Sequence, residues 1–326
     1  MLELLGWTAD YYQHPPGETL ILGLSPRERR GEPPASTHED GFTLTLRGEG
    51  LSDAALSRAP RQQALIAALR AGPKTRAELR DSGFKPDNLR ALITRSLIEP
   101  VTMHANKAWS CRTPLTANTE QSLAITHINA SLGEFSCHLL EGVTGSGKTE
   151  VYLQAIAAAL ARQEQTLVLI PEIGLTPQLV QRFNERFDAP IVTLHSGLGT
   201  AERDRNWQAA RSGQAAIIIG TRSAVFAPML TPGLIIVDEE HDVSLSQQDG
   251  LRYSARDVAV KRAQLSGCPI VLGSATPSLE SMANATNARY RWHRLTQRAA
   301  GARPPTKHIV DIRGLALRAG LSPKLQ

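Results

Sequence analysis

Short apolar runs recur along the chain after residue 114, and amphipathic stretches of helical length separate them. Runs with no alternating polar position are typical of strands buried on both faces, as in parallel sheets that helices cover on both sides. We therefore predict an α/β lobe over residues 114–300. Its predicted strands are residues 137–140, 166–170, 191–194, 216–219, 234–237 and 270–272.

Residues 57–113 show a different pattern, of short helices. Apolar residues recur at helical spacing over 62–70 and 86–96, and Thr75 with Glu78 forms a capping box that starts a helix over 75–80. A strand is predicted from residue 97. Three helices followed by a β-ribbon indicate a winged-helix domain whose third helix, with Arg90 and Arg95, enters a DNA groove. A helical spacer with solvated arginines fits the same pattern.

Residues 1–56 are rich in Pro and Gly and leave room only for short elements. The alternation of apolar and polar residues over 42–47 predicts one strand. We interpret this segment as an incomplete domain.

Composition and charge exclude several classes of protein. The net charge of +5 permits a polyanionic partner without demonstrating one. The three cysteines are far apart and odd in number, which excludes a disulfide framework or a paired-cysteine zinc site and favours a reducing compartment. The first residues make a poor signal peptide, and no apolar run approaches the roughly 18 residues that span a bilayer. We therefore expect no membrane partner.

A phosphate-binding loop is predicted between the strand at 137–140 and the helix that follows. Its residues are Gly142, Val143, Thr144, Gly145, Ser146, Gly147, Lys148 and Thr149. Glycines let backbone N–H groups converge on phosphates, while the lysine reaches the β- and γ-phosphates and the threonine hydroxyl ligates Mg²⁺. The sequence thus predicts a P-loop NTPase.

A second half of this site is predicted at the end of the strand over 234–237. Asp238 and Glu239 follow four apolar residues, so they emerge at the carboxyl edge of the sheet, where parallel sheets bind ligands. Asp238 is placed to hold Mg²⁺ alongside Thr149, and Glu239 to orient or deprotonate the attacking water. A surface acidic turn is the alternative, but it does not explain why two carboxylates end so apolar a strand.

The run Asp-Glu-Glu-His at 238–241, with Gly-Ser-Ala-Thr-Pro at 273–277, resembles superfamily 2 helicases, which have RecA-like lobes. Further stretches resemble the PriA family of replication-restart helicases (primosomal protein N′). They lie at residues 7–12, 142–152, 171–178, 194–198, 220–224, 247–250 and 273–278. The resemblance runs from end to end. It marks residues 1–56 as a remnant of the family's N-terminal DNA-binding domain.

The resemblance implies roles for individual residues. Gln121 would recognise adenine, and residues 171–178, 195–197 and 220–223 would line the face that grips single-stranded DNA. Contacts to DNA are expected from Thr221, Arg222 and Tyr253. His241, at the nucleotide, would couple ATP state to DNA state together with Ser274 and Thr276. Arg222 in a sheet-edge ion pair, and His241 as a structural histidine, are the alternatives.

Two departures from the family stand out. The loop after residue 241 is aromatic-rich in the family, yet Leu245 and Leu251 stand where aromatics are expected and only Tyr253 remains. We therefore expect weak coupling of DNA to ATP turnover. Residues 301–326 resemble the start of a linker to a second lobe with an arginine finger and a zinc-binding insertion. We expect zinc only in that further part, and a chain truncated at both ends.

The expected function is an ATP- and Mg²⁺-dependent 3′–5′ DNA helicase that assembles the primosome at stalled forks and D-loops. The resemblance implies branched and single-stranded DNA, primosome proteins and single-strand-binding protein as partners, in a bacterial cytoplasm near the nucleoid. This chain would bind ATP and DNA without unwinding alone. The alternatives are a non-hydrolysing, ATP-gated DNA-binding or adaptor module and another superfamily 2 DNA translocase.

Overall fold

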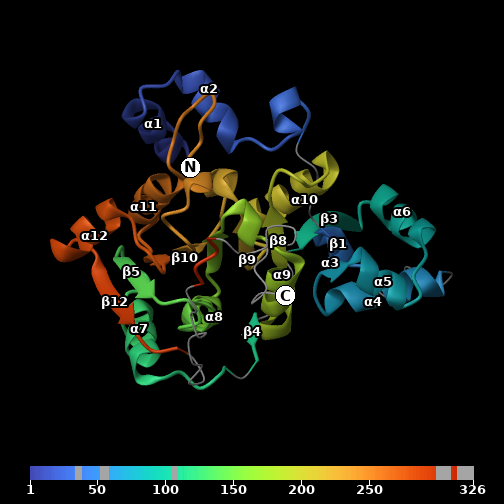
Figure 1. The fold of residues 1–326 in the computed structure, drawn as a ribbon. Coiled ribbons are helices and arrows are strands. Elements are labelled where there is room, and N and C mark those ends of the chain that lie inside the picture. The colour runs from blue at the N-terminus through green and yellow to red at the C-terminus, as the bar shows by residue number, and fades with distance from the viewer. Residues whose placement is uncertain (34–38, 52–58, 104–108, 113, 299–309, 314–326) are drawn as a thin grey trace.

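A seven-stranded sheet, parallel throughout, forms the centre of the larger lobe (Figure 1). The computed structural model describes residues 1–33, 39–51, 59–103, 109–112, 114–298 and 310–313. The sheet order is β12-β5-β11-β10-β6-β9-β8. Its strands are β5 (Cys137–Gly142), β6 (Gln165–Leu169), β8 (Ile191–Leu194), β9 (Ile217–Gly220), β10 (Pro232–Val237), β11 (Ile270–Ser274) and β12 (Arg291–Leu295).

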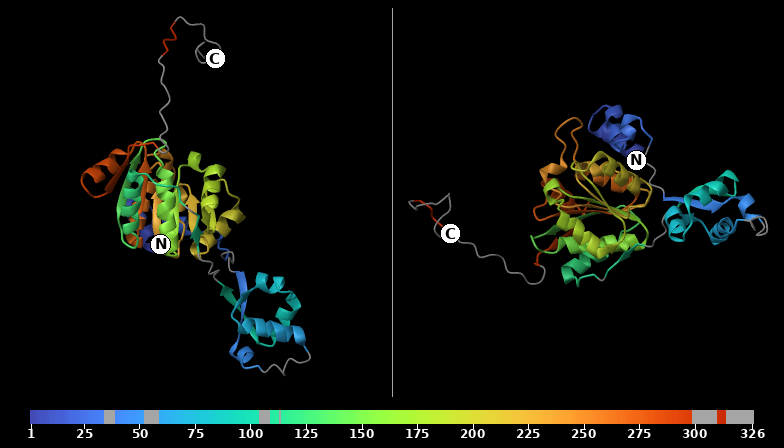
Figure 2. Two further views of the ribbon diagram at one scale, coloured as in Figure 1. Left: turned by 90° about the horizontal axis from the view of Figure 1, so that it is seen from below. Right: turned by 90° about the vertical axis from the view of Figure 1, so that its right-hand side faces the viewer.

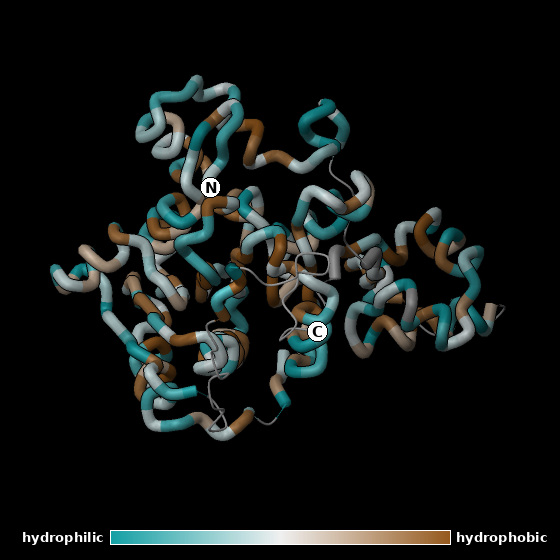
Figure 3. Tube along the Cα trace, in the orientation of Figure 1, coloured by the Kyte–Doolittle hydropathy of each residue, from teal (hydrophilic) through white to brown (hydrophobic). Residues whose placement is uncertain are grey.

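Helices cover both faces of the sheet and bury two separate cores. The helices are α7 (Thr119–Ala130), α8 (Lys148–Ala161), α9 (Pro177–Arg186), α10 (Thr200–Arg211), α11 (Ala255–Ser266) and α12 (Leu279–Thr286). Along β10, Leu234 and Ile236 face the core under α7, α8 and α9, whereas Ile235 and Val237 face the core under α10 and α11. Figure 3 shows the apolar stretches of these inner strands. In the described part of the chain, no helix combines the length and apolar character needed to cross a membrane.

The predicted parallel α/β lobe is confirmed, and every predicted strand of it forms. One further strand, β12, pairs in parallel with β5 at the edge of the sheet. It escaped prediction because its sequence, Arg-Trp-His-Arg-Leu, buries only His293 and Leu295 and has no apolar run. An edge strand covered on one face does not carry the signature of a central parallel strand.

A smaller unit lies beside this lobe (Figure 2). It comprises β1 (Glu39–Leu44), α3 (Leu46–Glu49), α4 (Pro60–Arg70), β2 (Lys74–Thr75), α5 (Arg76–Asp81), α6 (Pro86–Thr94) and β3 (Ile98–Met103). The three strands form an antiparallel sheet with β1 in the middle, over a core of its own. The predicted helices and the Thr75–Glu78 capping box are present. Because β1 pairs with β3, the expected boundary at residue 56 runs through one sheet, and the winged-helix assignment stays a prediction.

The first thirty residues pack on the larger lobe instead of forming a unit of their own. In α1 (Leu2–Tyr11), Leu4 and Leu5 join the core beneath α11. The Tyr12 hydroxyl accepts a hydrogen bond of 3.1 Å from the Ser254 backbone N–H. After α2 (Pro16–Leu20), Glu28 forms an ion pair of 2.6 Å with Arg211 of α10. These contacts attach the segment to the larger lobe.

A buried histidine pair joins β5 to β12. His138 is fully buried and His293 nearly so, and His138 Nδ1 lies 2.9 Å from His293 Nε2. Ser131 Oγ lies 2.9 Å from the other ring nitrogen of His138. Burial lowers the pKa of His138 to about 3 and that of His293 to about 4. Both rings are therefore neutral in the folded chain at neutral pH.

We predict that this pair makes the fold acid-sensitive. Below pH 6.5, about the pKa of a histidine in the unfolded chain, the unfolded chain binds protons that the folded chain does not bind. The free energy of unfolding therefore falls as pH falls from 6.5 towards 4. Each histidine adds up to about 1.4 kcal/mol per pH unit to this slope. Denaturant unfolding between pH 8 and 4.5 measures it. The double substitution His138→Leu/His293→Phe should flatten the slope, whereas His14→Gln should not; an unchanged slope in the double variant contradicts the assignment.

Candidate functional site

The carboxyl edge of the parallel sheet collects the predicted site residues. The phosphate-binding loop follows β5, Ser274 ends β11, and Asp238 follows β10. These three strands are neighbours in the sheet, in the order β5, β11, β10. The remaining predicted segments, at 171–178, 195–197 and 220–223, follow β6, β8 and β9 on the other side of β10. The edge therefore has two halves that meet at β10.

The phosphate-binding loop has the backbone that its glycines permit. Gly145 and Gly147 adopt φ angles of +80° and +85°, in the left-handed region that other residues rarely occupy. Gly147 caps the N-terminus of α8, so the free N–H groups of that helix open into the loop. Lys148 Nζ donates a hydrogen bond of 3.1 Å to the Gly142 carbonyl. The loop is thus shaped to receive an anion.

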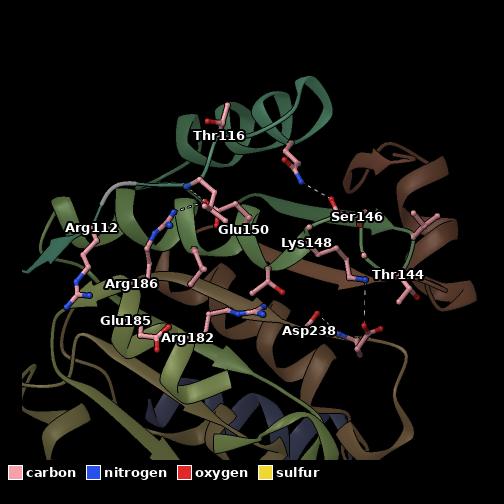
Figure 4. Close-up of a pocket in the computed structure, with 18 residues that line it drawn as sticks. Arg112, Thr116, Thr144, Ser146, Lys148, Glu150, Arg182, Glu185, Arg186 and Asp238 are labelled. Atoms are coloured by element: carbon pink, nitrogen blue, oxygen red, sulfur yellow. Dashed lines mark hydrogen bonds and ion pairs between the residues drawn. The ribbon is translucent and has the colours of Figure 1, made fainter. Parts of the chain in front are cut away.

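A pocket of about 770 Å³ opens above this loop (Figure 4). Its described lining includes Gln121, residues 143–149, Asp238 and Glu239, so most of the predicted nucleotide residues come together. Gly142 lies behind the lining, as the acceptor for Lys148. The other lining residues are Arg112, Leu115, Thr116, Glu150, Leu153, Arg182, Glu185 and Arg186. Its volume suits a nucleotide-sized ligand.

The carboxylates after β10 face the loop lysine. Glu239 Oε1 lies 3.6 Å from Lys148 Nζ, and the Glu239 backbone has a φ of +45°, in the left-handed region. Asp238 Oδ1 accepts hydrogen bonds from the Tyr152 hydroxyl at 2.9 Å and from the Glu239 N–H at 3.1 Å. Burial raises the pKa of Asp238 above its ordinary value. The pair is held in a fixed geometry opposite Lys148.

The residues predicted to hold Mg²⁺ suit that ion. Thr149 and Asp238 line the same pocket, and a hydroxyl with a carboxylate forms a hard oxygen donor set. Both hydrogen bonds that reach the Asp238 side chain end on Oδ1; among the described residues no donor occupies Oδ2. One carboxylate oxygen is therefore free for a metal or its bound water.

Gln121 is bound to the phosphate-binding loop. Its side chain is 5% exposed and donates from Nε2 to the Ser146 carbonyl at 2.8 Å. Its Oε1 accepts from the Asn118 N–H at 2.9 Å, within a capping box at the start of α7. Gln121 thus couples the helix start to the loop, and the adenine contact that the resemblance implies stays a prediction.

The far end of the pocket was not predicted from the sequence. There Arg186 of α9 forms an ion pair of 2.6 Å with Glu150 of α8, and Glu150 also accepts from the Leu115 N–H at 3.2 Å. The pairing of β4 (Ser110–Cys111) with β7 (Phe187–Asp188) brings Arg112 to the same place. No spacing along the chain predicts contacts between residues so far apart in the sequence. The one signal is a charged residue, Arg186, at a helix position that is buried.

His241 is not part of the described pocket lining, but it lies between the two predicted motifs. Its Nδ1 lies 2.8 Å from Ser274 Oγ, and its Nε2 lies 3.3 Å from Thr276 Oγ1. Its Nδ1 also lies 3.7 Å from Glu239 Oε2. The three residues expected to act together are thus brought together. Their role in coupling stays a prediction.

Glu240 anchors the same motif, and the sequence did not single it out. It is 3% exposed, and Arg256 of α11 lies 3.2 Å from its Oε2. The Ser278 N–H and the hydroxyls of Ser278 and Ser281 also donate to its carboxylate. This network fixes the segment after β10 to the segment after β11. Each of the four consecutive residues 238–241 therefore contacts at least one side chain outside the run.

Arg222 binds the loop that follows this motif, not a carboxylate. Its Nη1 donates to the Ser244 carbonyl at 3.3 Å and to the Ser246 carbonyl at 3.0 Å. Its positive charge also lies near the Tyr253 hydroxyl and lowers the pKa of that group, against the larger effect of burial. Thr221 is 4% exposed and its N–H donates to the Leu194 carbonyl at 3.1 Å. Thr221 therefore offers little surface, and Arg222 is half-buried with its guanidinium committed to the loop.

The expectation for Tyr253 and the two leucines requires correction. Tyr253 is 5% exposed and packs edge-on against Phe226 at 5.1 Å, so its ring has no free face for a base. Burial raises its pKa to about 12. Leu245 and Leu251 are 2% and 7% exposed and belong to the same core. Leucine at these positions fills the core, and an aromatic there would overpack it instead of restoring a DNA contact.

Comparison with known protein families finds a match that includes the carboxyl edge of the sheet. The sequence profile described as DEAD/DEAH box helicase matches residues 118–285, half of the chain. The chain belongs to the DEAD/DEAH box helicase family. The matched part of this helicase lobe starts at the cap of α7 and ends in α12, so it contains both halves of the carboxyl edge.

The predicted resemblance to the PriA family is also confirmed. The chain is 40% identical to "Replication restart protein PriA" of Haemophilus influenzae, over 98% of this chain and 45% of the relative. It is 38% identical to "Replication restart protein PriA" of Bacillus subtilis, over 83% of this chain and 35% of the relative. This helicase chain thus spans less than half the length of these relatives. The solved "Structure of RecG bound to three-way DNA junction" matches 59% of this chain and 25% of its own, at TM-score 0.45 and 24% identity.

We predict that Gln121→Leu weakens nucleotide binding whatever the base. The substitution leaves the Ser146 carbonyl without its buried donor, which costs about 1–3 kcal/mol and loosens the loop. Titration with fluorescent ADP and GDP should show a similar loss of roughly tenfold for both. A loss confined to the adenine nucleotide contradicts the positioning role and supports direct base recognition. Gln264→Leu, at an exposed position of α11 outside the pocket, is a matched control.

Proposed function

We propose that this chain is the first motor lobe of an ATP-dependent DNA helicase that acts in replication restart. The observation that carries the proposal is the pocket in which the phosphate-binding loop, Asp238 and Glu239 meet, with Lys148 3.6 Å from Glu239. The names of the PriA relatives support the biological setting. The same names support DNA as the polymer on which the lobe acts, because replication restart takes place on DNA.

The nucleotide half binds ATP through its phosphates. The N–H groups of the loop and of the first turn of α8 donate hydrogen bonds to the phosphate oxygens. The Lys148 ammonium neutralises their negative charge. Thr149 and Asp238 hold Mg²⁺, which supplies charge stabilisation at the β- and γ-phosphates when bound. Glu239 accepts a hydrogen bond from the attacking water and orients it towards the γ-phosphate. Each role follows from residues that line one pocket.

The DNA half lies beyond β10, at the ends of β6, β8 and β9. Ile173 after β6 and Ser196 and Gly197 after β8 are exposed, which leaves backbone at this edge open to a ligand. Exposed backbone N–H groups and hydroxyls suit a phosphate backbone, because phosphate contact needs donors and no base readout. We propose that single-stranded DNA lies along this half, with Arg222 behind it and without Tyr253.

Several finer properties belong to the same proposal and come from the resemblance. They are 3′–5′ polarity, action at stalled forks and D-loops, contact with primosome proteins and single-strand-binding protein, and a cytoplasmic, nucleoid-associated location. The winged-helix interpretation of the smaller unit belongs here too, with α6 as the helix that meets DNA. Arg90, in the middle of α6, and Arg95, its C-cap residue, are both exposed and suit such a contact.

Two substitutions in the pocket test the proposed activity. Lys148→Ala removes the charge at the phosphates and should abolish detectable ATP binding. Glu239→Gln keeps the shape of the site but removes the carboxylate, so it should bind ATP and lower turnover by at least about a hundredfold. Equilibrium binding of fluorescent ATP and release of phosphate, each with and without single-stranded DNA, measure both effects.

The controls separate the alternatives. Arg289→Gln, on the turn after α12, changes charge away from the pocket and should leave binding and turnover unchanged. Retained ATP affinity in Lys148→Ala contradicts the nucleotide site. Tight ATP binding by the native chain with no turnover on any DNA contradicts the enzymatic role and favours an ATP-gated adaptor.

A further inference from the structure

A buried tyrosine hydroxyl contacts the carboxylate of the nucleotide half. Tyr152 lies one helical turn after Lys148 in α8, so both side chains point from the same face of the helix towards the sheet. Its side chain is 3% exposed, and its hydroxyl donates a hydrogen bond of 2.9 Å to Asp238 Oδ1.

Strand β11 leaves room for the contact between Tyr152 and Asp238. β11 lies between β5 and β10 in the sheet, and it carries glycine at position 273. A Cβ atom at Gly273 would lie 1.6 Å from the Tyr152 hydroxyl oxygen, a distance at which the ring could not stay. The Gly273 carbonyl in turn accepts a hydrogen bond of 3.0 Å from the Glu240 N–H. Glycine here thus serves the passage of the tyrosine to Asp238.

The contact determines which oxygen of Asp238 is available. Tyr152 and the Glu239 N–H both donate to Oδ1. A carboxylate that is held by two donors on one oxygen cannot rotate freely, so its other oxygen keeps one direction. In metal sites, groups that do not touch the metal ion orient its ligands in this way. Loss of such a group typically lowers metal affinity or activity 10- to 100-fold.

We propose that Tyr152 is the positioning residue for the Mg²⁺-binding carboxylate, and that Gly273 provides the gap through which it acts. The inference rests on the proposed nucleotide site. It adds to that site a group which lies behind the carboxylate and has no contact of its own with the phosphates. Its loss affects the step that depends on the metal and leaves the phosphate contacts of the loop intact.

The test is the Mg²⁺ dependence of nucleotide binding by the 326-residue chain. Tyr152→Phe removes only the hydroxyl and keeps the ring that packs in the core. Fluorescent ADP is titrated in EDTA and then over a range of Mg²⁺ concentrations. We expect unchanged affinity in EDTA and a Mg²⁺ midpoint roughly tenfold higher than in the native chain. Tyr290→Phe is the matched control, since that hydroxyl interacts with the Cys137 thiol at the opposite end of β5.

A double-substitution cycle separates positioning from packing. In an Asp238→Asn background the carboxylate is gone, so adding Tyr152→Phe should shift the Mg²⁺ midpoint no further. An unchanged midpoint in Tyr152→Phe overturns the inference, and so does a loss of affinity in EDTA, which would indicate a structural role. If Lys148→Ala also leaves nucleotide binding intact, the proposed nucleotide site itself fails. The two failures are therefore distinguishable.

Discussion

Burial of a parallel sheet on both faces is the constraint on which the rest of this structure depends. Parallel neighbours need a crossover connection, usually a helix, between one strand and the next, so all the strands end at one edge and all the connections start there. In this lobe the edge holds the phosphate-binding loop, the acidic run and the Ser274 segment on three adjacent strands. The candidate site residues lie close together because the topology brings the carboxyl ends of these strands to one edge of the sheet.

The acidic run is the point at which this edge is joined together. Asp238 receives the Tyr152 hydroxyl, and Glu239 faces Lys148. Glu240 is tied to Arg256 and Ser278, and His241 to Ser274 and Thr276. These direct contacts connect the proposed nucleotide site to the segment after β11 and to α11. The loop that Arg222 holds starts at the next residue. Contiguous contacts of this kind are one physical route by which two sites are coupled, and coupling itself is measured by its effect on binding.

The sequence predicted the parts of the fold and site that repeat a simple pattern. Apolar runs marked the central strands, and the glycines with Lys148 marked the loop, because local chemistry dictates both. β12 was missed because an edge strand buries too few residues to show such a pattern. The far end of the pocket was missed because Glu150 and Arg186 meet only through the packing of α8 on α9. Tyr253 was assigned to DNA because the resemblance implied an aromatic-rich loop that senses DNA, and no pattern in the sequence shows that this ring packs in the core.

The central claim is that phosphates and metal meet between the loop after β5 and the carboxylate after β10. The most direct measurement is a crystal structure of this chain with a non-hydrolysable ATP analogue and Mn²⁺, whose anomalous signal locates the ion. The account predicts an anomalous peak between Thr149 and Asp238, directly or through one water, with Lys148 on the phosphates. A nucleotide bound outside the loop, or an ion remote from Asp238, would contradict it.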